Sequence, residues 1–242
     1  MSSAIERQKT YYAETASHYD EMHDEPEHLV ALHLLAAFIQ FYNIRSVLDV
    51  GAGTGRAMGW LKQRFPDVIV KGIEPVEQLR KKAYDKGIPS NDLVAGDGYA
   101  LPFEPNSFDL VCEFAVLHHV ERPNRVVAEM SRVASRMVCI SDCNFMGQGP
   151  NWLRPLKYLI YVAGLWPAAN WIKTRGKGYT YSEGDGIAYS YSVFQSLRIL
   201  RRSWKDIRLI RTSAATDGRW RTMLGAGHVL VIATRSLSEG QQ

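Results

Sequence analysis

Short apolar runs alternate along this chain with stretches in which apolar residues recur at helical spacing. We expect strands near residues 46–50, 68–73, 92–95, 108–113 and 136–142, and helices near 54–65, 76–86 and 122–133. Strands that alternate with helices predict a parallel sheet with helices on both faces, and right-handed crossovers fix most of its topology. The pattern therefore indicates an α/β fold with a doubly wound, mostly parallel sheet.

Helical spacing also precedes and follows this core. Residues 4–20 and 27–42 predict two N-terminal helices, and Ser192 to Trp204 predict a further helix. Strands near 207–213 and 227–235 complete a seven-stranded sheet, and the short stretch 214–225 between them suits a hairpin. We expect one domain with N-terminal cover helices (1–43), a core (44–142), an insertion (143–190) and the end of the core (191–235).

The first strand of the predicted core runs directly into a glycine turn. Asp49 lies in the apolar run, and Gly51, Gly53 and Gly55 follow at alternate positions. Glycines here let the backbone approach a ligand closely, and the helix that follows supplies free N–H groups. The spacing matches neither the dinucleotide motif nor the phosphate-binding P-loop, because Arg56 and Ala57 follow. Asp49 would repel a phosphate but would accept hydrogen bonds from an ammonium group, which favours a cationic nucleoside that carries an amino acid.

Three further motifs follow in order, each at the end of a predicted strand. Residues 68–75 end in Glu74 and Pro75, residues 93–103 contain Asp97, and residues 108–120 lead from a fourth strand into two histidines. Open α/β sheets bind ligands at these strand ends, and an acid after the second strand can accept both ribose hydroxyls. Taken alone, each acid could instead be a helix N-cap, a solvated loop residue or a turn former.

With these motifs, residues 44–142 resemble the class I S-adenosylmethionine-dependent methyltransferases, in their small-molecule, type 11-like branch. The resemblance implies S-adenosylmethionine as cofactor, S-adenosylhomocysteine as product, and a C-terminal hairpin whose last strand is antiparallel. It also implies that Asp97 pairs with the adenine amino group. The expected cofactor-binding residues are Asp49, Gly51, Ala52, Gly53, Gly55, Glu74, Pro75, Gly96, Asp97, Gly98, Phe114 and Ala115.

Methyl transfer to a hydroxyl requires removal of a proton, and a histidine with a near-neutral pKa suits this role. His118 and His119 follow the fourth strand, so we expect one of them to face the cofactor, with preference for His119. The other would pack under the loop or cap the next helix. Asp142 and Asn144, at the end of the fifth strand, are second candidates for orienting or accepting the proton. The spacing does not demand a metal, and we expect none.

The insertion is expected to recognise the acceptor. Between Asn151 and Lys173, apolar residues recur at helical spacing, which predicts a lid helix packed on the domain; the alternative is an aromatic, basic face at a membrane. Residues 173–186 hold four glycines among charged residues and tyrosines, so we expect a solvated or substrate-binding loop without regular structure. The candidate substrate-binding residues are Tyr11, Tyr19, Asn144, Arg175 and Tyr181, with Lys177 as an alternative to Arg175.

Composition narrows the remaining possibilities. No apolar run approaches the ~20 residues that span a bilayer, the N-terminus lacks the apolar core of a secretory signal, and the three cysteines suggest a reduced, cytoplasmic protein. The net charge is +4, yet residues 154–211 hold eleven Lys and Arg against three acids, a net +8. Nucleic acid is not expected as a partner, because residues 113–116 lack the Asn/Asp-Pro-Pro-aromatic motif of base methylation and no RNA-binding module is present.

We therefore expect O-methylation of a hydroxyl on a small acceptor that is anionic, glycan-like or natural-product-like. One alternative is C- or N-methylation of a lipid-like acceptor at the membrane surface, and peripheral membrane contact stays open. Another is a partner subunit that binds the cofactor without catalysis. The oligomeric state is left open.

Overall fold

The computed structural model describes residues 3–22, 26–213 and 225–235. Its main sheet has seven strands in the order β3-β2-β1-β4-β5-β9-β8. They are β1 (Ser46–Val50), β2 (Ile69–Ile73), β3 (Leu93–Val94), β4 (Phe108–Phe114), β5 (Ala134–Cys143), β8 (Asp206–Arg211) and β9 (His228–Thr234). The first five strands pair in parallel, whereas β9 is antiparallel to both β5 and β8. This confirms the predicted seven-stranded, mostly parallel sheet and its antiparallel C-terminal hairpin.

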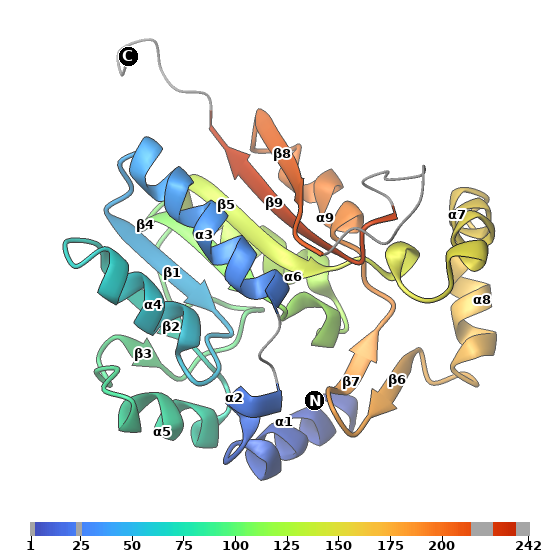
Figure 1. Ribbon diagram of the computed structural model, residues 1–242, viewed down its shortest axis with the longest axis horizontal. Helices are drawn as coiled ribbons and strands as arrows, with labels where there is room; N and C mark the ends of the chain where they lie inside the picture. The colour runs from blue at the N-terminus through green and yellow to red at the C-terminus, as the bar shows by residue number, and fades with distance from the viewer. Residues whose placement is uncertain (1–2, 23–25, 214–224, 236–242) are drawn as a thin grey trace.

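Helices cover both faces of this sheet (Figure 1). They are α1 (Ser3–Thr15), α2 (Tyr19–Met22), α3 (Pro26–Phe41), α4 (Arg56–Arg64), α5 (Glu77–Asp85), α6 (Pro123–Val133), α7 (Arg154–Val162), α8 (Trp166–Lys173) and α9 (Val193–Leu200). Apolar side chains of α6 and α9 build one core with the sheet, and those of α3 and α4 build the other. Because both faces of the central strands are buried, these strands read as continuous apolar runs in the sequence.

The N-terminal helix is shorter than expected. The sequence predicts one helix over 4–20, but α1 ends at Thr15 and α2 begins at Tyr19. Two partners of Asp20 explain the break: the Thr54 hydroxyl donates to its carboxylate at 2.5 Å, and the Lys86 ammonium forms an ion pair with it. These contacts hold α2 against the glycine turn, so the chain bends where a single helix would have continued.

The prediction that residues 173–186 lack regular structure is wrong. Tyr179–Ser182 (β6) pairs antiparallel with Gly186–Tyr189 (β7), and the two strands form a separate hairpin. Gly186 has a positive φ of 68°, and a Cβ there would lie 2.6 Å from Gln8 Oε1. Alternating tyrosines supply the strand preference, and glycine lets the hairpin lie directly against α1, which crosses the carboxyl ends of the main strands beside β7 (Figure 1).

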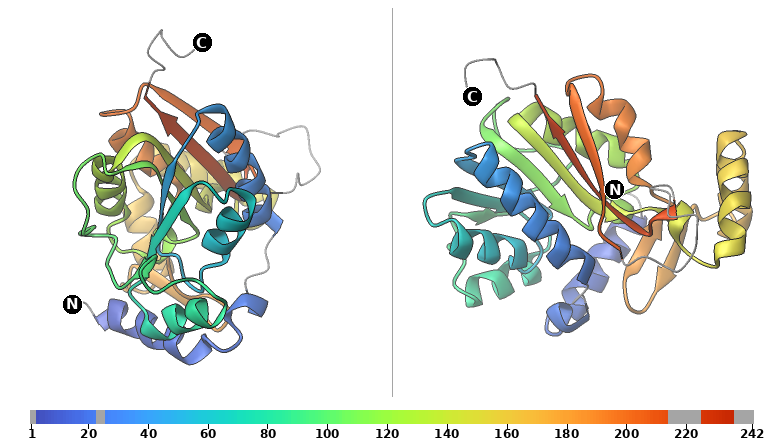
Figure 2. Two further views of the ribbon diagram at one scale, coloured as in Figure 1. Left: turned by 90° about the vertical axis from the view of Figure 1, so that its left-hand side faces the viewer. Right: turned by 45° about the horizontal axis from the view of Figure 1, so that its top comes forward.

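The predicted lid helix over 151–173 is two helices, and its packing differs from the expectation. Gly164, with φ of 72°, ends α7, and Pro167 follows at the start of α8. Neither helix contains a buried residue, so the apolar stripe is not the core face that we expected. Both helices lie at the end of the molecule remote from β3 and α5, as two views show (Figures 1 and 2).

Two expectations remain, one for the loop before β9 and one for membrane-spanning helices. The predicted loop 214–225 lies almost entirely outside the described residues. Among the residues that are described, no helix combines the length and the apolar character needed to cross a bilayer.

Candidate active site

The glycine turn after β1 forms the floor of a cleft of about 530 Å³. Gly51 and Ala52 donate their N–H groups to the Ile73 carbonyl, which ties the turn to β2 at 2.9 Å in both bonds. Gly51 and Gly53 have positive φ angles of 76° and 56°, and a Cβ on Gly51 would lie 2.6 Å from Val116. The turn therefore needs glycine for its backbone conformation and for the close approach of the loop after β4.

Asp49 and Glu74 are buried carboxyl groups at the ends of β1 and β2. Burial, followed by repulsion from Glu74, raises the pKa of Asp49 to about 7. Burial also raises the pKa of Glu74 to about 7, although Gly53 and Val76 donate N–H groups to its two oxygens at 3.0 and 2.8 Å. Within the described residues, Asp49 accepts no such bond, yet it lines the cleft. A buried carboxyl group without a partner suits a cationic ligand.

A second, smaller hollow of about 150 Å³ adjoins the cleft. Glu74, Pro75 and Asp97 line it, and Asp97 accepts the N–H of Tyr99 at 2.9 Å. The residues shared by the two hollows are Tyr19, Gly51, Gly53, Phe114, Ala115 and His119. An elongated ligand that touches both Asp49 and Asp97 would therefore pass these six residues.

Three other glycines that the sequence predicts to bind cofactor pack against side chains of the domain. A Cβ on Gly55 would meet Ala83 and Ile88, one on Gly96 would meet Ile73, and one on Gly98 would meet Val126 at 3.1 Å. These glycines lie against core side chains, so close packing alone explains why glycine occupies these positions. Their contact with cofactor stays a prediction.

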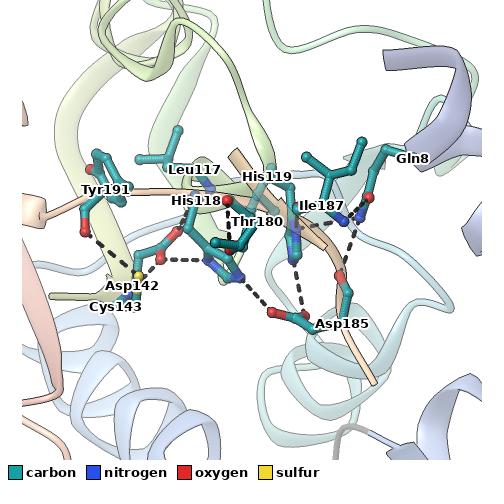
Figure 3. A network of polar contacts seen from close by, with 12 residues as sticks. Gln8, Leu117, His118, His119, Asp142, Cys143, Thr180, Asp185, Ile187 and Tyr191 are labelled. Carbon is teal, nitrogen blue, oxygen red and sulfur yellow. Dashed lines mark hydrogen bonds and ion pairs between the residues drawn. The ribbon is translucent and has the colours of Figure 1, made fainter. Parts of the chain in front are cut away.

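Two histidines and two carboxylates form a connected cluster at the side of the cleft (Figure 3). His118 lies between the carboxylates: its Nδ1 is 2.7 Å from Asp142 Oδ1 and its Nε2 is 3.6 Å from Asp185 Oδ2. His119 places its Nε2 3.3 Å from Asp185 Oδ1, and the two imidazole rings are 3.9 Å apart. The structure thus brings together His118, His119 and Asp142, and it adds Asp185 from the loop between β6 and β7.

Charge distinguishes the two histidines. Burial opposes a charge on His118, but Asp142 and Asp185 outweigh it and hold the pKa of His118 well above its usual range. Burial likewise opposes ionisation of Asp142, yet His118 and the Cys143 N–H bring the pKa of Asp142 to about 2. Asp142 also accepts the Leu117 N–H at 2.8 Å, which fixes the turn that carries both histidines. His118 is therefore an imidazolium near neutral pH, and a proton acceptor must be sought elsewhere.

His119 is held in one orientation by the hairpin and by α1. Its Nδ1 donates to the Ile187 carbonyl at 2.6 Å, so a neutral ring carries its lone pair on Nε2, toward the cleft. Gln8 of α1 accepts the Ile187 N–H at 2.5 Å, and its Nε2 lies 3.3 Å from His119 Nδ1 (Figure 3). The ligand atoms of His118, His119 and Asp185 lie within 4.8 Å of one another, a spacing that a metal ion would also accept. Ion pairs between protonated histidines and Asp185 account for the same arrangement without a metal ion.

The candidate substrate residues have different surroundings. Tyr19 lines both hollows, whereas Tyr11 is buried between α1 and the hairpin, where its hydroxyl donates to the Glu183 carbonyl at 2.9 Å. Tyr181 is half exposed under the guanidinium of Arg7. Each role in substrate binding stays a prediction.

Asn144 and Arg175 also differ from a simple pocket lining. Asn144 is fully buried and its amide bonds to the Ala226 carbonyl and the Met146 N–H, which anchors the chain after β5. Arg175 is exposed at a positive φ of 52°, and Lys173, not chosen from the sequence, lines the cleft. The sequence pattern also singles out neither Asp185 nor Gln8, because Asp185 is one of several charged residues in 173–186 and Gln8 is one of several polar residues in the predicted N-terminal helix.

A family model described as "Methyltransferase domain" matches residues 48–137. A tRNA (carboxymethyluridine(34)-5-O)-methyltransferase of Saccharomyces cerevisiae is 29% identical over 57% of this chain and 47% of its own. A malonyl-[acyl-carrier protein] O-methyltransferase of Laribacter hongkongensis is 31% identical over 74% of this chain and 64% of its own. A demethylmenaquinone methyltransferase of Renibacterium salmoninarum is 38% identical over 36% of this chain and 35% of its own. The chain thus spans between about a third and two thirds of the length of these relatives.

Solved structures share the fold over nearly the whole chain. A methyltransferase of Thermotoga maritima, described as a possible histamine N-methyltransferase, superposes with a TM-score of 0.61 at 15% identity and covers 94% of this chain and 99% of its own. Magnesium protoporphyrin IX methyltransferase of Synechocystis, with bound S-adenosylhomocysteine, has a TM-score of 0.54 at 18% identity and covers 98% and 88%. At such identities the likeness concerns the fold.

Proposed function

Because the chain carries a methyltransferase domain and has the class I fold of the S-adenosylmethionine-dependent methyltransferases, we propose that it methylates a hydroxyl oxygen of a small acceptor. In this proposal Asp49 binds the ammonium group of the cofactor, Glu74 the ribose hydroxyls and Asp97 the adenine amino group. The bound cofactor supplies a methyl carbon made electrophilic by its sulfonium. The fit rests on the buried carboxyl of Asp49, which has no hydrogen-bond partner among the described residues, and on the two adjoining hollows that join it to Asp97.

We propose His119 as the group that takes the acceptor proton. With His118 cationic and Asp142 and Asp185 ionised, the cluster carries a net charge of −1 while His119 is neutral. Protonation of His119 Nε2 would bring the cluster to zero, with Asp185 at 3.3 Å as counter-ion. The Asp185 carboxylate therefore stabilises the His119 imidazolium that proton transfer forms.

His118 and Asp142 have a positioning role in this scheme. Asp142 accepts the Leu117 N–H and the His118 ring, so it sets the turn from which His119 projects. His118 cannot accept a proton when it is already an imidazolium, but it holds Asp185 ionised next to His119. The single observation that carries the proposal is this cluster at the wall of the cleft.

His119→Gln tests the assignment. Calorimetry with S-adenosylhomocysteine should give the same affinity as the wild type, because the ammonium, ribose and adenine partners are unchanged. Methyl transfer from labelled S-adenosylmethionine to a panel of phenolic, sugar and aliphatic alcohols should fall by about 10²–10⁴-fold, the usual contribution of a general base. Equal turnover in both proteins would remove His119 from the mechanism, and absence of cofactor binding in the wild type would remove the function itself.

A lipid-like acceptor, methylated at nitrogen or carbon, is the second candidate. The observation that favours it is the exposed apolar face of α7 and α8, whose Lys173 lines the cleft. One of the relatives is named as a demethylmenaquinone methyltransferase. Inclusion of amines and quinols in the same panel separates the two, since an N-methylated product stays titratable whereas an O-methyl ether does not.

A further inference from the structure

The helices α7 and α8 present an apolar surface to solvent that lacks a partner in the described chain. We call it the α7–α8 face, and its most exposed members are Trp152, Leu156, Leu159, Val162, Leu165, Trp171 and Ile172. Trp152 is 75% exposed and Ile172 is 71% exposed, values far from those of a packed helix. Large apolar side chains rarely gather in this way on a protein surface that binds nothing, so this face indicates a binding partner.

The orientation of α7 makes this exposure a property of the fold. Trp152, Leu156 and Leu159 recur at helical spacing, so they share one side of the segment. On the other side, Lys157 donates to the carbonyls of Phe145 and Gln148 at 3.1 and 2.6 Å. The helix is thus attached to the domain through its charged side, and its apolar side faces outward.

Aromatic packing attaches α8 to the domain. Trp166 stacks on Phe145 with 4.2 Å between the ring centroids, and Tyr161 of α7 meets the same ring at 5.9 Å. Phe145 lies two residues after the end of β5, so both helices are supported next to the end of a central strand. The face is therefore held in place without using its outer apolar residues.

Charge selects the occupant. Residues 143–182 contain five Lys and Arg and no acidic residue. The exposed cations Lys173, Arg175 and Lys177 adjoin the end of α8. A second copy of this chain would bring the same positive charge against itself, whereas tryptophans and leucines bordered by cations suit the headgroup region of an anionic bilayer.

We propose that the α7–α8 face docks this protein on an anionic lipid bilayer. Neither helix is long enough to span a membrane, at 9 and 8 residues, so the apolar side chains would enter only the headgroup and upper acyl region. Lys173, the last residue of α8, lines the cleft, so docking would bring this part of the cleft near the lipid surface. The inference concerns binding alone and does not depend on the reaction that the cleft performs.

Vesicle flotation of the full chain tests this directly. The probes are vesicles of phosphatidylcholine alone and vesicles that also contain phosphatidylglycerol, each without cofactor or acceptor. The wild type should float with the anionic vesicles, float less with the neutral ones, and release in high salt because the charges are screened. Trp152→Ser/Leu156→Ser/Leu159→Ser should lower the partition coefficient by at least about tenfold, since three apolar side chains no longer enter the interface.

Phe41→Ser/Ile69→Ser provides the matched control. These side chains are 73% and 59% exposed on α3 and β2, so the change removes exposed apolar surface from outside the α7–α8 face. This control should float like the wild type, and melting curves and S-adenosylhomocysteine binding should show that both variants are folded. Equal flotation of the triple variant and the wild type, or equal binding to both vesicle types, would overturn the proposal. A wild-type dimer that the triple variant abolishes would instead assign the face to a second copy of the chain.

Discussion

Replacement of Asp49 by asparagine should stabilise the cofactor-free protein and at the same time weaken its binding of S-adenosylhomocysteine. Asp49 is 2% exposed, and its pKa is raised from 3.8 to about 7 by burial and by Glu74. Such a rise corresponds to roughly 4 kcal/mol of unfolding free energy, lost once the buried carboxyl ionises. The amide has the same shape without the charge, so this figure is the upper bound of the gain in Asp49→Asn.

The pH dependence of this gain has a definite sign. Below about pH 4 the Asp49 carboxyl is protonated in both the folded and the unfolded chain, so it carries no cost. Between that pH and the folded-state pKa of about 7, the folded protein retains a proton that the unfolded chain has released. Stability therefore falls as the pH rises through this window, and the full cost is present above it. Asparagine does not titrate, so the melting temperatures of wild type and variant should converge near pH 4 and separate toward pH 8.

Cofactor binding should change in the opposite direction. The ammonium group of S-adenosylhomocysteine would lose its buried ionic partner, which costs about 3 kcal/mol or more and raises Kd by at least about 100-fold in calorimetry. Glu113→Gln is the control, because Glu113 is a buried acid on β4 whose pKa burial raises well above its usual value. It should alter stability without changing Kd. A wild-type Kd in Asp49→Asn, or a difference in melting temperature that is the same at every pH, would refute the reasoning.

The other predictions concern the charge cluster and the hairpin. Asp142→Asn should lower stability near neutral pH by about 3–5 kcal/mol, because it removes the nearer of the two carboxylates that balance the buried His118 charge. This loss should vanish as acid brings the wild type below its Asp142 pKa of about 2. Denaturant titration measures it, and an unchanged midpoint would contradict it. Asp185→Asn should bring the pKa of His118 down toward its usual range, as NMR titration of the imidazole can show, with S-adenosylhomocysteine affinity kept. Gly186→Ala should cost about 1–3 kcal/mol through the positive φ and the 2.6 Å approach to Gln8, seen as a lower melting temperature; a wild-type value would argue against tight contact with α1.

The sequence was sufficient for the sheet because each of its signals is local. The apolar runs at β1 and β4 are buried on both faces, so strand and burial coincide in the pattern. The glycine turn and the acids at the strand ends carry their meaning in spacing alone, and parallel strands bring such ends to one edge. The sequence therefore places the predicted cofactor-binding residues at one edge of the sheet, and their contact with cofactor stays a prediction.

The hairpin and the α7–α8 segment resisted prediction because their signals are not local. Asp185 gains significance only when the hairpin pairs and lies against α1, and Gly186, which permits that contact, looks like one more loop glycine. The stripe at Trp152 and Leu156 has the same periodicity whether it faces a core or solvent, since periodicity reports a shared side and not what covers it. The hydrogen bonds of Lys157 show which side of α7 faces the domain, and therefore that the apolar side faces solvent. This orientation is visible only in the tertiary structure.

The boundary of the matched domain divides the site in a way that bears on acceptor choice. Residues 48–137 contain Asp49, Glu74, Asp97 and both histidines, but Gln8 and Asp185, which orient and charge-balance His119, lie outside this segment. The relatives named for a tRNA, an acyl-carrier protein and a quinone align with this chain over 143, 199 and 91 residues, so their acceptors differ although each shares sequence with it. If the matched segment supplies the cofactor site, a change of acceptor would have to arise from the elements around it. In this chain those elements are α1, the β6–β7 hairpin and the α7–α8 face, and the hairpin links the first to His119, so acceptor recognition and proton removal would be set by the same contacts.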